Sequence, residues 1–305
     1  MKRRSILAAA ALAAFAFAAL PAQTAVAASE STLTAETIHY DTNNKNISAT
    51  GGVVITREGS VLSGDKAEGN TEKEEYTLLG NVRGSFPQNK VEIKYADKLK
   101  LTKAKNVKSD GVAEAFGKVR ITRGAGDYLN ADYVQWELGT DNYLARGRVD
   151  ALMEDKVMKA DEAGRSGEKF WGRNVVRYED RKQKTGLTAQ TVDGIVRGNV
   201  VQESVAKGNV AMDYIDKNGL KSVVTGDTAV YSKARGTVVV SGNARAVRSD
   251  GKTVNADSLV LHEDTRNIDA IGNSRITVIM EDKNKNTDKN AVASKKSSKK
   301  KSGGQ

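Results

Sequence analysis

The chain of 305 residues contains no cysteine and only two prolines. Without cysteine, disulfide bonds cannot hold the fold together. Long stretches of apolar residues at the 3.6-residue helical period are absent, and nothing after residue 27 resembles the run of about 20 apolar residues that a membrane-spanning helix needs. The short alternating runs that remain, bounded by Gly, Asn and Asp, favour an all-β protein.

Signatures of catalysis are also scarce. The two histidines, His39 and His262, lie in distant segments, and without cysteine they give no support for a zinc site. The G-x-S-x-G phrase of serine hydrolases is missing, and GVAEAFGKV at 111–119 does not fit a phosphate-binding loop. Acidic residues occur singly along the chain, without the converging pair that acid and base catalysis needs. We therefore expect no enzyme, no metal and no cofactor.

Residues 1–27 have the pattern of a secretory signal peptide. Lys2, Arg3 and Arg4 precede an apolar stretch, and Ala25-Val26-Ala27 offers the small residues at which a signal peptidase cleaves. The mature protein is therefore predicted to be exported and soluble. The alternative is an N-terminal anchor that is retained.

The last segment, 281–305, contains eight lysines, three acids and no aromatic residue, and it is predicted to be a disordered tail. Of the formal net charge of +10, the signal and the tail account for all but about +2. The folded body is thus almost neutral, and no nucleic-acid partner is expected. The tail is predicted to hold to anionic surfaces or to act as a solubilising end.

A six-residue phrase recurs along residues 28–280. Each copy has a small residue, an acid, and apolar side chains two and four residues after the acid. The copies are AETIHY (35–40), ADKLKL (96–101), ADYVQW (131–136), GDTAVY (226–231) and ADSLVL (256–261). Because successive side chains of a strand point to opposite faces, each copy is predicted to be one half-buried strand.

A glycine followed by a polar residue, and usually by valine, lies downstream of each acid. The separation is 15 residues for Glu36 to Gly51, Asp65 to Gly80, Asp132 to Gly147, Asp227 to Gly242 and Asp257 to Gly272. Turn-rich segments such as DTNNKN and KARG lie between acid and glycine. We predict a unit of strand, turn, strand and glycine corner, repeated about every 30 residues and stacked on its neighbours. The acids are expected to accept hydrogen bonds from nearby backbone amides.

Two copies depart from this spacing. Asp97 to Gly117 carries an insertion, and Asp161 to Gly172 is shortened. The least regular segment is 155–204. If residues 28–280 divide into two lobes, we expect the lobes to meet there.

The phrases LNADYVQW, ARGRV, AKGNV and VNADSLVL, following a signal peptide, resemble the OstA-type (LptA-like) periplasmic domain of lipopolysaccharide-transport proteins. The resemblance implies an elongated antiparallel β-jellyroll with an open groove. The apolar interior of this groove would receive the acyl chains of lipopolysaccharide or of a related glycolipid. The resemblance also implies head-to-tail self-association, and inner- and outer-membrane transport components with similar folds as partners. The implied location is the periplasm.

The alternating pattern then selects candidate site residues. The predicted lipid-binding interior consists of Ile38, Tyr40, Leu99, Leu101, Val134, Trp136, Tyr231, Leu259 and Leu261. The alternative is that these side chains pack only against one another as core. Basic residues predicted to meet the phosphate and sugar headgroup are Arg120, Arg123, Arg146 and Arg148.

A different class of protein also repeats short strands in an exported chain. This alternative is a β-solenoid, either an adhesin-like scaffold or a polysaccharide-active β-helix. A cleft lined by stacked aspartates would favour the carbohydrate enzyme, whereas one acid per repeat favours a scaffold or a conduit.

Overall fold

The computed structural model describes residues 31–278, except 58, 88–89, 103–110, 125, 139, 199, 216–218 and 266. The predicted signal (1–27) and tail (281–305) lie outside the described residues. The described part contains eighteen β-strands and no α-helix. The strands are β1 (Ser31–Thr34), β2 (Thr37–Asp41), β3 (Asn46–Arg57), β4 (Ser60–Asn70), β5 (Glu75–Phe86), β6 (Val91–Thr102), β7 (Gly111–Arg123), β8 (Asp127–Leu138), β9 (Tyr143–Met153), β10 (Lys156–Ser166), β11 (Lys169–Asp180), β12 (Thr185–Arg197), β13 (Val200–Ile215), β14 (Lys221–Ser232), β15 (Thr237–Arg248), β16 (Thr253–His262), β17 (Ile268–Ile271) and β18 (Arg275–Thr277).

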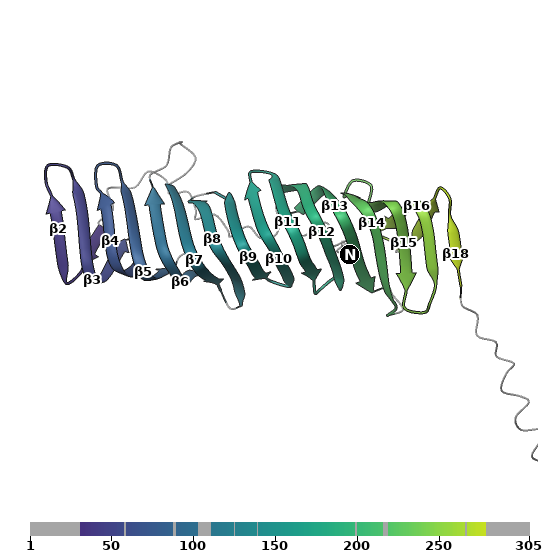
Figure 1. The fold of residues 1–305 in the computed structure, drawn as a ribbon, viewed down its shortest axis with the longest axis horizontal. Helices are drawn as coiled ribbons and strands as arrows, with labels where there is room; N and C mark the ends of the chain where they lie inside the picture. Colours follow the sequence, from purple (N-terminus) through teal and green to yellow (C-terminus); the bar gives the residue numbers. More distant parts are fainter. Residues whose placement is uncertain are drawn as a thin grey trace, which may run out of the picture.

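Each strand from β2 to β16 pairs in antiparallel fashion with the next strand in the sequence. The result is one long sheet in which neighbours in sequence are neighbours in space, as the colour gradient of Figure 1 shows. The all-β, antiparallel, elongated prediction is thereby confirmed. The β-solenoid alternative is wrong for the described residues, because the coils of a parallel β-helix pair in parallel.

The sheet has split strands at both ends. Both β1 and β2 pair with β3, and both β17 and β18 pair with β16. The first and last strands lie at opposite ends of the row (Figure 1). The sheet is therefore open and does not close into a barrel. Pairing also continues through 155–204, where β10 to β13 form successive ladders.

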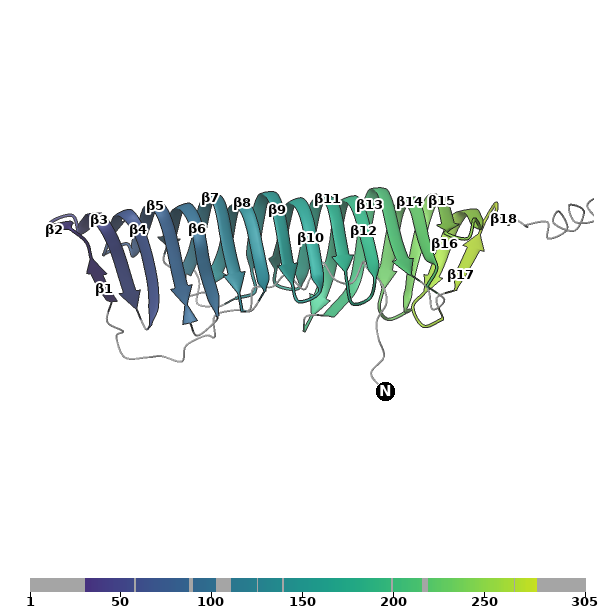
Figure 2. The ribbon, with the colours of Figure 1, turned by 90° about the horizontal axis from the view of Figure 1, so that it is seen from below.

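Every ladder from β3 to β16 contains a register shift near its middle. A bulge inserts an extra residue in one strand and bends it. Because the bulges align from strand to strand, the whole sheet is bent along its length into an arch (Figure 2). The hairpin turns form the two long rims of this arch.

The glycine phrase supplies the bulge. At Gly80 and Asn81 the φ angles are +74° and +49°, the left-handed region that glycine and asparagine tolerate best. The carboxylate of Asp65 covers Gly80, so a Cβ there would lie 2.9 Å from Asp65 Cγ. Asn81 Nδ2 donates a hydrogen bond to Asp65 Oδ2 at 3.0 Å. The constant acid-to-glycine spacing thus places the acid of one strand over the corner of the next.

The same arrangement recurs at the other predicted pairs, where Gly51, Gly147, Gly242 and Gly272 lie beneath their acids. The donors to these acids include side chains of asparagine and arginine. Asn273 donates to Asp257 at 3.0 Å, and Arg148 bonds Asp132. The acids therefore have a structural role, and the donors to Asp65, Asp132 and Asp257 are side chains of the neighbouring corner, whereas donation from backbone amides stays a prediction.

The two copies with irregular spacing, at Asp97 and Asp161, also form a corner in which the acid faces the next strand. Gly117 lies beneath Asp97 despite the longer spacing, because the extra residues fall after the end of β6 and before the start of β7. The assignment of Gly172 to Asp161 is wrong: Asp161 accepts a hydrogen bond from Asn174 at 2.9 Å, and Gly172 pairs with Ala163. Arg173 precedes Asn174 where the other corners have glycine.

Candidate functional site

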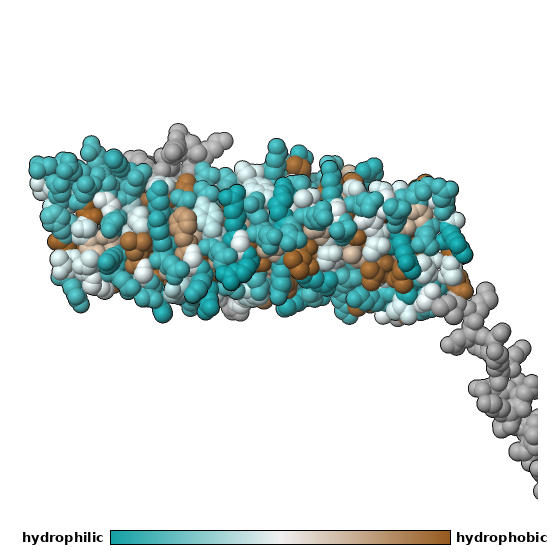
Figure 3. Space-filling view, in the orientation of Figure 1, coloured by the Kyte–Doolittle hydropathy of each residue, from teal (hydrophilic) through white to brown (hydrophobic). Residues whose placement is uncertain are grey.

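The apolar side chains of all these strands form one cluster inside the arch. The cluster begins at Ala49 in β3 and ends at Leu261 in β16. Both halves of a strand, before and after its corner, contribute side chains to the cluster. In β5, for example, Leu78 lies before the corner and Val82 after it, and both are fully buried. The face of the molecule seen in Figure 3 is mainly hydrophilic, with scattered apolar residues.

Most residues of the predicted interior lie in or against this cluster. Its buried members are Leu99, Val134, Tyr231, Leu259 and Leu261. Leu101 and Trp136 are partly buried and pack against it. The burial of these residues shows that they share one apolar interior. Contact between this interior and lipid stays a prediction.

Ile38 and Tyr40 differ from the others. They pair with Ala49 and Ile47, but β2 is the terminal strand and no further strand covers them, so each is 45% exposed. At the opposite end, Ile276 of β18 pairs with Val254 and is 66% exposed. The apolar interior therefore ends in exposed apolar side chains at both ends of the sheet.

Three of the four predicted headgroup arginines have carboxylate partners. Arg123 contacts Asp127 at 3.0 Å and Arg146 contacts Glu162 at 2.8 Å, while Arg148 forms an ion pair with Asp132. The Arg148 guanidinium also lowers the pKa of the Asp132 carboxyl. Arg120, Arg146 and Arg148 are exposed on β7 and β9, whereas Arg123 lies at a rim.

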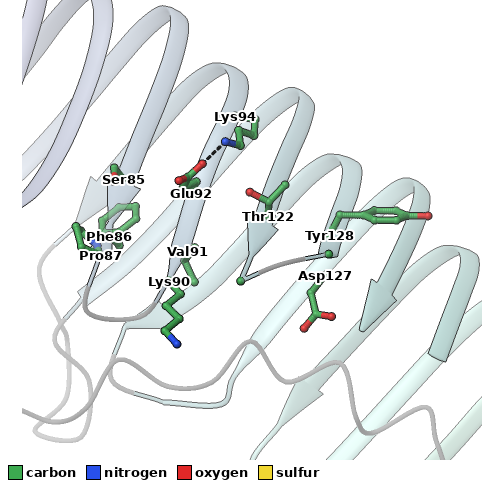
Figure 4. Close-up of a pocket in the computed structure, with 12 residues that line it drawn as sticks. Ser85, Phe86, Pro87, Lys90, Val91, Glu92, Lys94, Thr122, Asp127 and Tyr128 are labelled. Atoms are coloured by element: carbon green, nitrogen blue, oxygen red, sulfur yellow. Dashed lines mark ion pairs between the residues drawn. The ribbon is translucent and has the colours of Figure 1, made fainter. Parts of the chain in front are cut away.

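A hollow of about 650 Å³ lies at that rim, between the turn joining β5 to β6 and the turn joining β7 to β8 (Figure 4). The two turns are held together by a hydrogen bond from the Gly124 amide to the Lys90 carbonyl, 2.9 Å long. Phe86 and Val91 connect the hollow to the apolar cluster, while Lys90 and Asp127 give it a charged side. The hollow has no sequence signature, because it arises only where two turns far apart in sequence stack.

Polar side chains on the outside of the arch are engaged with one another. The Tyr133 hydroxyl donates to Glu114 at 2.7 Å, and Trp171 Nε1 donates to Glu162 at 2.7 Å. Burial, followed by the hydrogen bond to Glu114, raises the pKa of Tyr133 to about 12. Within the described part of the chain, no three His, Cys, Asp or Glu side chains gather to hold a metal ion. The described residues also form no helix that is long and apolar enough to span a membrane.

The fold and the interior together define an elongated, open antiparallel sheet that is bent over an apolar core, an arrangement suited to binding or bridging. A family model described as lipopolysaccharide-assembly, LptC-related, matches residues 19–87. This match supports the resemblance to the OstA-type lipopolysaccharide-transport family. The chain is also similar to a crystal structure of LptH, described as the LptA-homologous periplasmic component of the lipopolysaccharide transport device of Pseudomonas aeruginosa. The identity is 17%, the TM-score is 0.35, and the alignment covers 41% of this chain and 93% of that one. None of the curated proteins matches the sequence.

Proposed function

We propose that the protein shelters the acyl chains of lipopolysaccharide, or of a related glycolipid, inside the bent sheet and carries them across the periplasm without catalysing a reaction. The observation that carries this proposal is the continuous apolar interior, which ends in exposed apolar side chains at both ends of the arch. Each buried methylene is worth about 0.8 kcal/mol, so an acyl chain gains several kcal/mol by leaving water for such an interior.

Entry of an acyl chain requires the two halves of the arch to separate, because the interior side chains are in mutual contact. The ladders run between neighbouring strands along the sheet, so this movement breaks apolar contacts without breaking ladder hydrogen bonds. The acyl chain replaces the lost contacts. Leu99, Leu101, Val134, Trp136, Tyr231, Leu259 and Leu261 are the proposed contacts, with Ile38 and Tyr40 at an end.

The headgroup stays outside the rim in this proposal. Arg123 is the best placed of the four predicted arginines, because it pairs with Val91 and precedes Gly124, and both of these residues line the hollow. Arg120, Arg146 and Arg148 are proposed to attract the phosphate from the outer surface.

The open ends suggest how copies of the chain connect. Terminal strands expose unpaired backbone groups that can pair with a strand of another molecule. We propose head-to-tail association with further copies and with membrane components of similar fold. The interiors would then join into a longer conduit.

Photo-crosslinking tests the acyl-chain site directly. Trp136 pairs with the buried Ala113 and Tyr143 and so lies on the inner face, whereas its neighbour Gln135 pairs with Glu114 on the outer face. A photoreactive residue at 136 should label lipid in the native envelope, and one at 135 should not. Mass spectrometry of the extracted adduct identifies the lipid. Equal labelling from both positions, or labelling from 135 alone, would contradict the proposal.

A further inference from the structure

Two hydroxyl groups in the interior have no hydrogen-bond partner among the described residues: those of Tyr178 in β11 and Thr185 in β12. Tyr178 is 0% exposed and Thr185 is 3% exposed. Burying a hydroxyl without a partner costs free energy, so folded proteins leave few of them. Burial also raises the pKa of Tyr178 well above its usual value, which keeps the phenol protonated and able to donate.

The two side chains are neighbours on the same face. Tyr178 pairs with Leu187, and Thr185 lies two residues before Leu187 in β12. The Cα atoms of such diagonal neighbours in an antiparallel pair lie about 7 to 8 Å apart, so both side chains line the same part of the interior. Both are close to the turn that joins β11 to β12, so the pair lies just inside a rim.

Methionines flank the pair. Met158 pairs with Tyr178 on one side, and Met212 pairs with Leu187 on the other. Met153, at the end of β9, is also buried. Unbranched methionine side chains re-pack easily around a guest molecule. The apolar lining around the two hydroxyls is therefore adaptable.

An ion pair links strands β11 and β13 on the outer face of the sheet, opposite the two hydroxyls. Arg177 in β11 forms an ion pair with Asp213 in β13 at 2.7 Å, crossing over β12 at Gly186. The ion pair lies over Gly186, where a Cβ would come within 2.7 Å of Arg177 Cζ and displace the guanidinium. The three strands are thus held together from outside while their inner lining can move.

We propose that Tyr178 and Thr185 form a polar subsite that hydrogen-bonds an oxygen atom near the head end of a bound acyl chain, such as a hydroxyl or an ester carbonyl. This inference rests on the proposed acyl-chain binding and specifies its ligand. The position just inside the rim matches the place where such an oxygen enters the interior, with the headgroup outside and the methylene chain among the methionines. The subsite thereby favours oxygen-bearing chains over plain hydrocarbon chains.

The test compares 3-hydroxytetradecanoic acid with tetradecanoic acid, each displacing a fluorescent fatty acid from the purified full chain. One hydrogen bond contributes about 1 kcal/mol, so the hydroxylated chain should bind about 3- to 10-fold more tightly. Tyr178→Phe should abolish this preference, so that the two acids displace the probe with equal affinity. Because it removes an unpartnered hydroxyl, Tyr178→Phe should also leave the thermal midpoint of the free protein unchanged or raise it.

Tyr133→Phe is the control. The Tyr133 hydroxyl lies on the outer face of the sheet, away from the proposed lipid contacts, and donates a hydrogen bond to Glu114 at 2.7 Å. This variant should keep the preference for the hydroxylated chain and lower the thermal midpoint. If Tyr178→Phe also keeps the preference and lowers the midpoint, the Tyr178 hydroxyl serves an internal water and the subsite is refuted. If the unaltered protein binds both acids equally, only the subsite fails, whereas binding of neither acid refutes the acyl-chain proposal itself.

Discussion

At the scale of the residue, the feature that repeats is a carboxylate lying over a glycine. The glycine provides the left-handed backbone of the bulge, and its missing side chain leaves room for the acid of the preceding strand. In β15 this glycine is Gly242, with φ +80°, and a Cβ there would lie 2.7 Å from Cβ of Asp227. Conformation and space both require glycine at such a corner.

Gly242→Ala should therefore destabilise β14 and β15 by more than about 2 kcal/mol, because the left-handed backbone alone costs a non-glycine residue about 1 to 2 kcal/mol. Gly236→Ala, in the turn before β15, is the control. Gly236 has φ +61°, but its nearest neighbour lies 3.8 Å from the position of a Cβ. Hydrogen exchange of the β14 and β15 amides measures the opening free energy. Equal losses in the two variants would show that the acid does not crowd the corner.

Tyr133 gives a prediction for alkaline pH. An unfolded tyrosine ionises near pH 10, whereas Tyr133 keeps its proton to about pH 12 in the folded protein. The unfolded state therefore loses its proton first, and the stability contributed by Tyr133 is lost as the pH rises from about 10 to 12. NMR titration of the ring should show the high pKa. In Glu114→Gln the pKa should fall but stay above 10, since burial is the larger cause; an unchanged value would rule out the effect of Glu114.

At the scale of the element, the bulge decides which face of a strand is buried. In β5 the inward residues Leu78 and Val82 are four positions apart, whereas in β4 the inward residues Leu62 and Ala67 are five apart; the extra residue of β5 at the Gly80–Asn81 corner keeps the two strands paired on both sides of the bend. Side chains alternate with period two, so a shift by one residue would turn the rest of β5 inside out.

Deletion of Asn81 should consequently expose Val82 and the apolar residues that follow it in β5, and lower the yield of soluble folded protein. Deletion of Lys73, in the exposed turn before β5, should be tolerated because it changes a loop and not the register. Limited proteolysis and circular dichroism of both variants provide the measurement. A soluble Asn81 deletion with native protection of β5 would refute this role of the bulge.

Much of this element structure could be predicted from sequence. Alternation and turn residues identify the strands, and the acid-to-glycine spacing marks each corner, because a hairpin of fixed length brings the two together. The acid-to-glycine spacing did not predict the corner that faces Asp161. There Asn174 forms the corner, and Arg173 precedes it in place of glycine. The spacing also missed Gly208, which lies beneath Gln190 and not beneath an acid. These two corners can be located only from the pairing between neighbouring strands, because their residue types differ from those of the repeat.

At the scale of the whole molecule, the two ends matter most. Ile38 in the terminal strand β2 and Ile276 in the terminal strand β18 lie on the inner face of the sheet, and both are exposed. Monomeric proteins rarely leave apolar side chains and unpaired strand edges together, so these ends are suited to an interface.

Ile276→Lys should reduce self-association, because a lysine at an edge opposes strand addition. Val176→Lys is a matched control, since Val176 is 60% exposed, comparable to 66% for Ile276, but lies on β11 in the middle of the sheet. Light scattering over a range of concentrations should show chains that lengthen in the unaltered protein and in Val176→Lys, and shorten in Ile276→Lys. A strict monomer at high concentration would exclude the head-to-tail proposal.

The sequence by itself determined the strands, their order and the corner residues, because these depend on contacts between segments adjacent in the chain. The antiparallel meander follows from that local pairing. Only the tertiary structure decided that aligned bulges bend the sheet over one common interior, that its ends expose Ile38 and Ile276, and that Tyr178 and Thr185 lie unpartnered within it. These features depend on the packing of many strands at once, and no single repeat contains the information that specifies them.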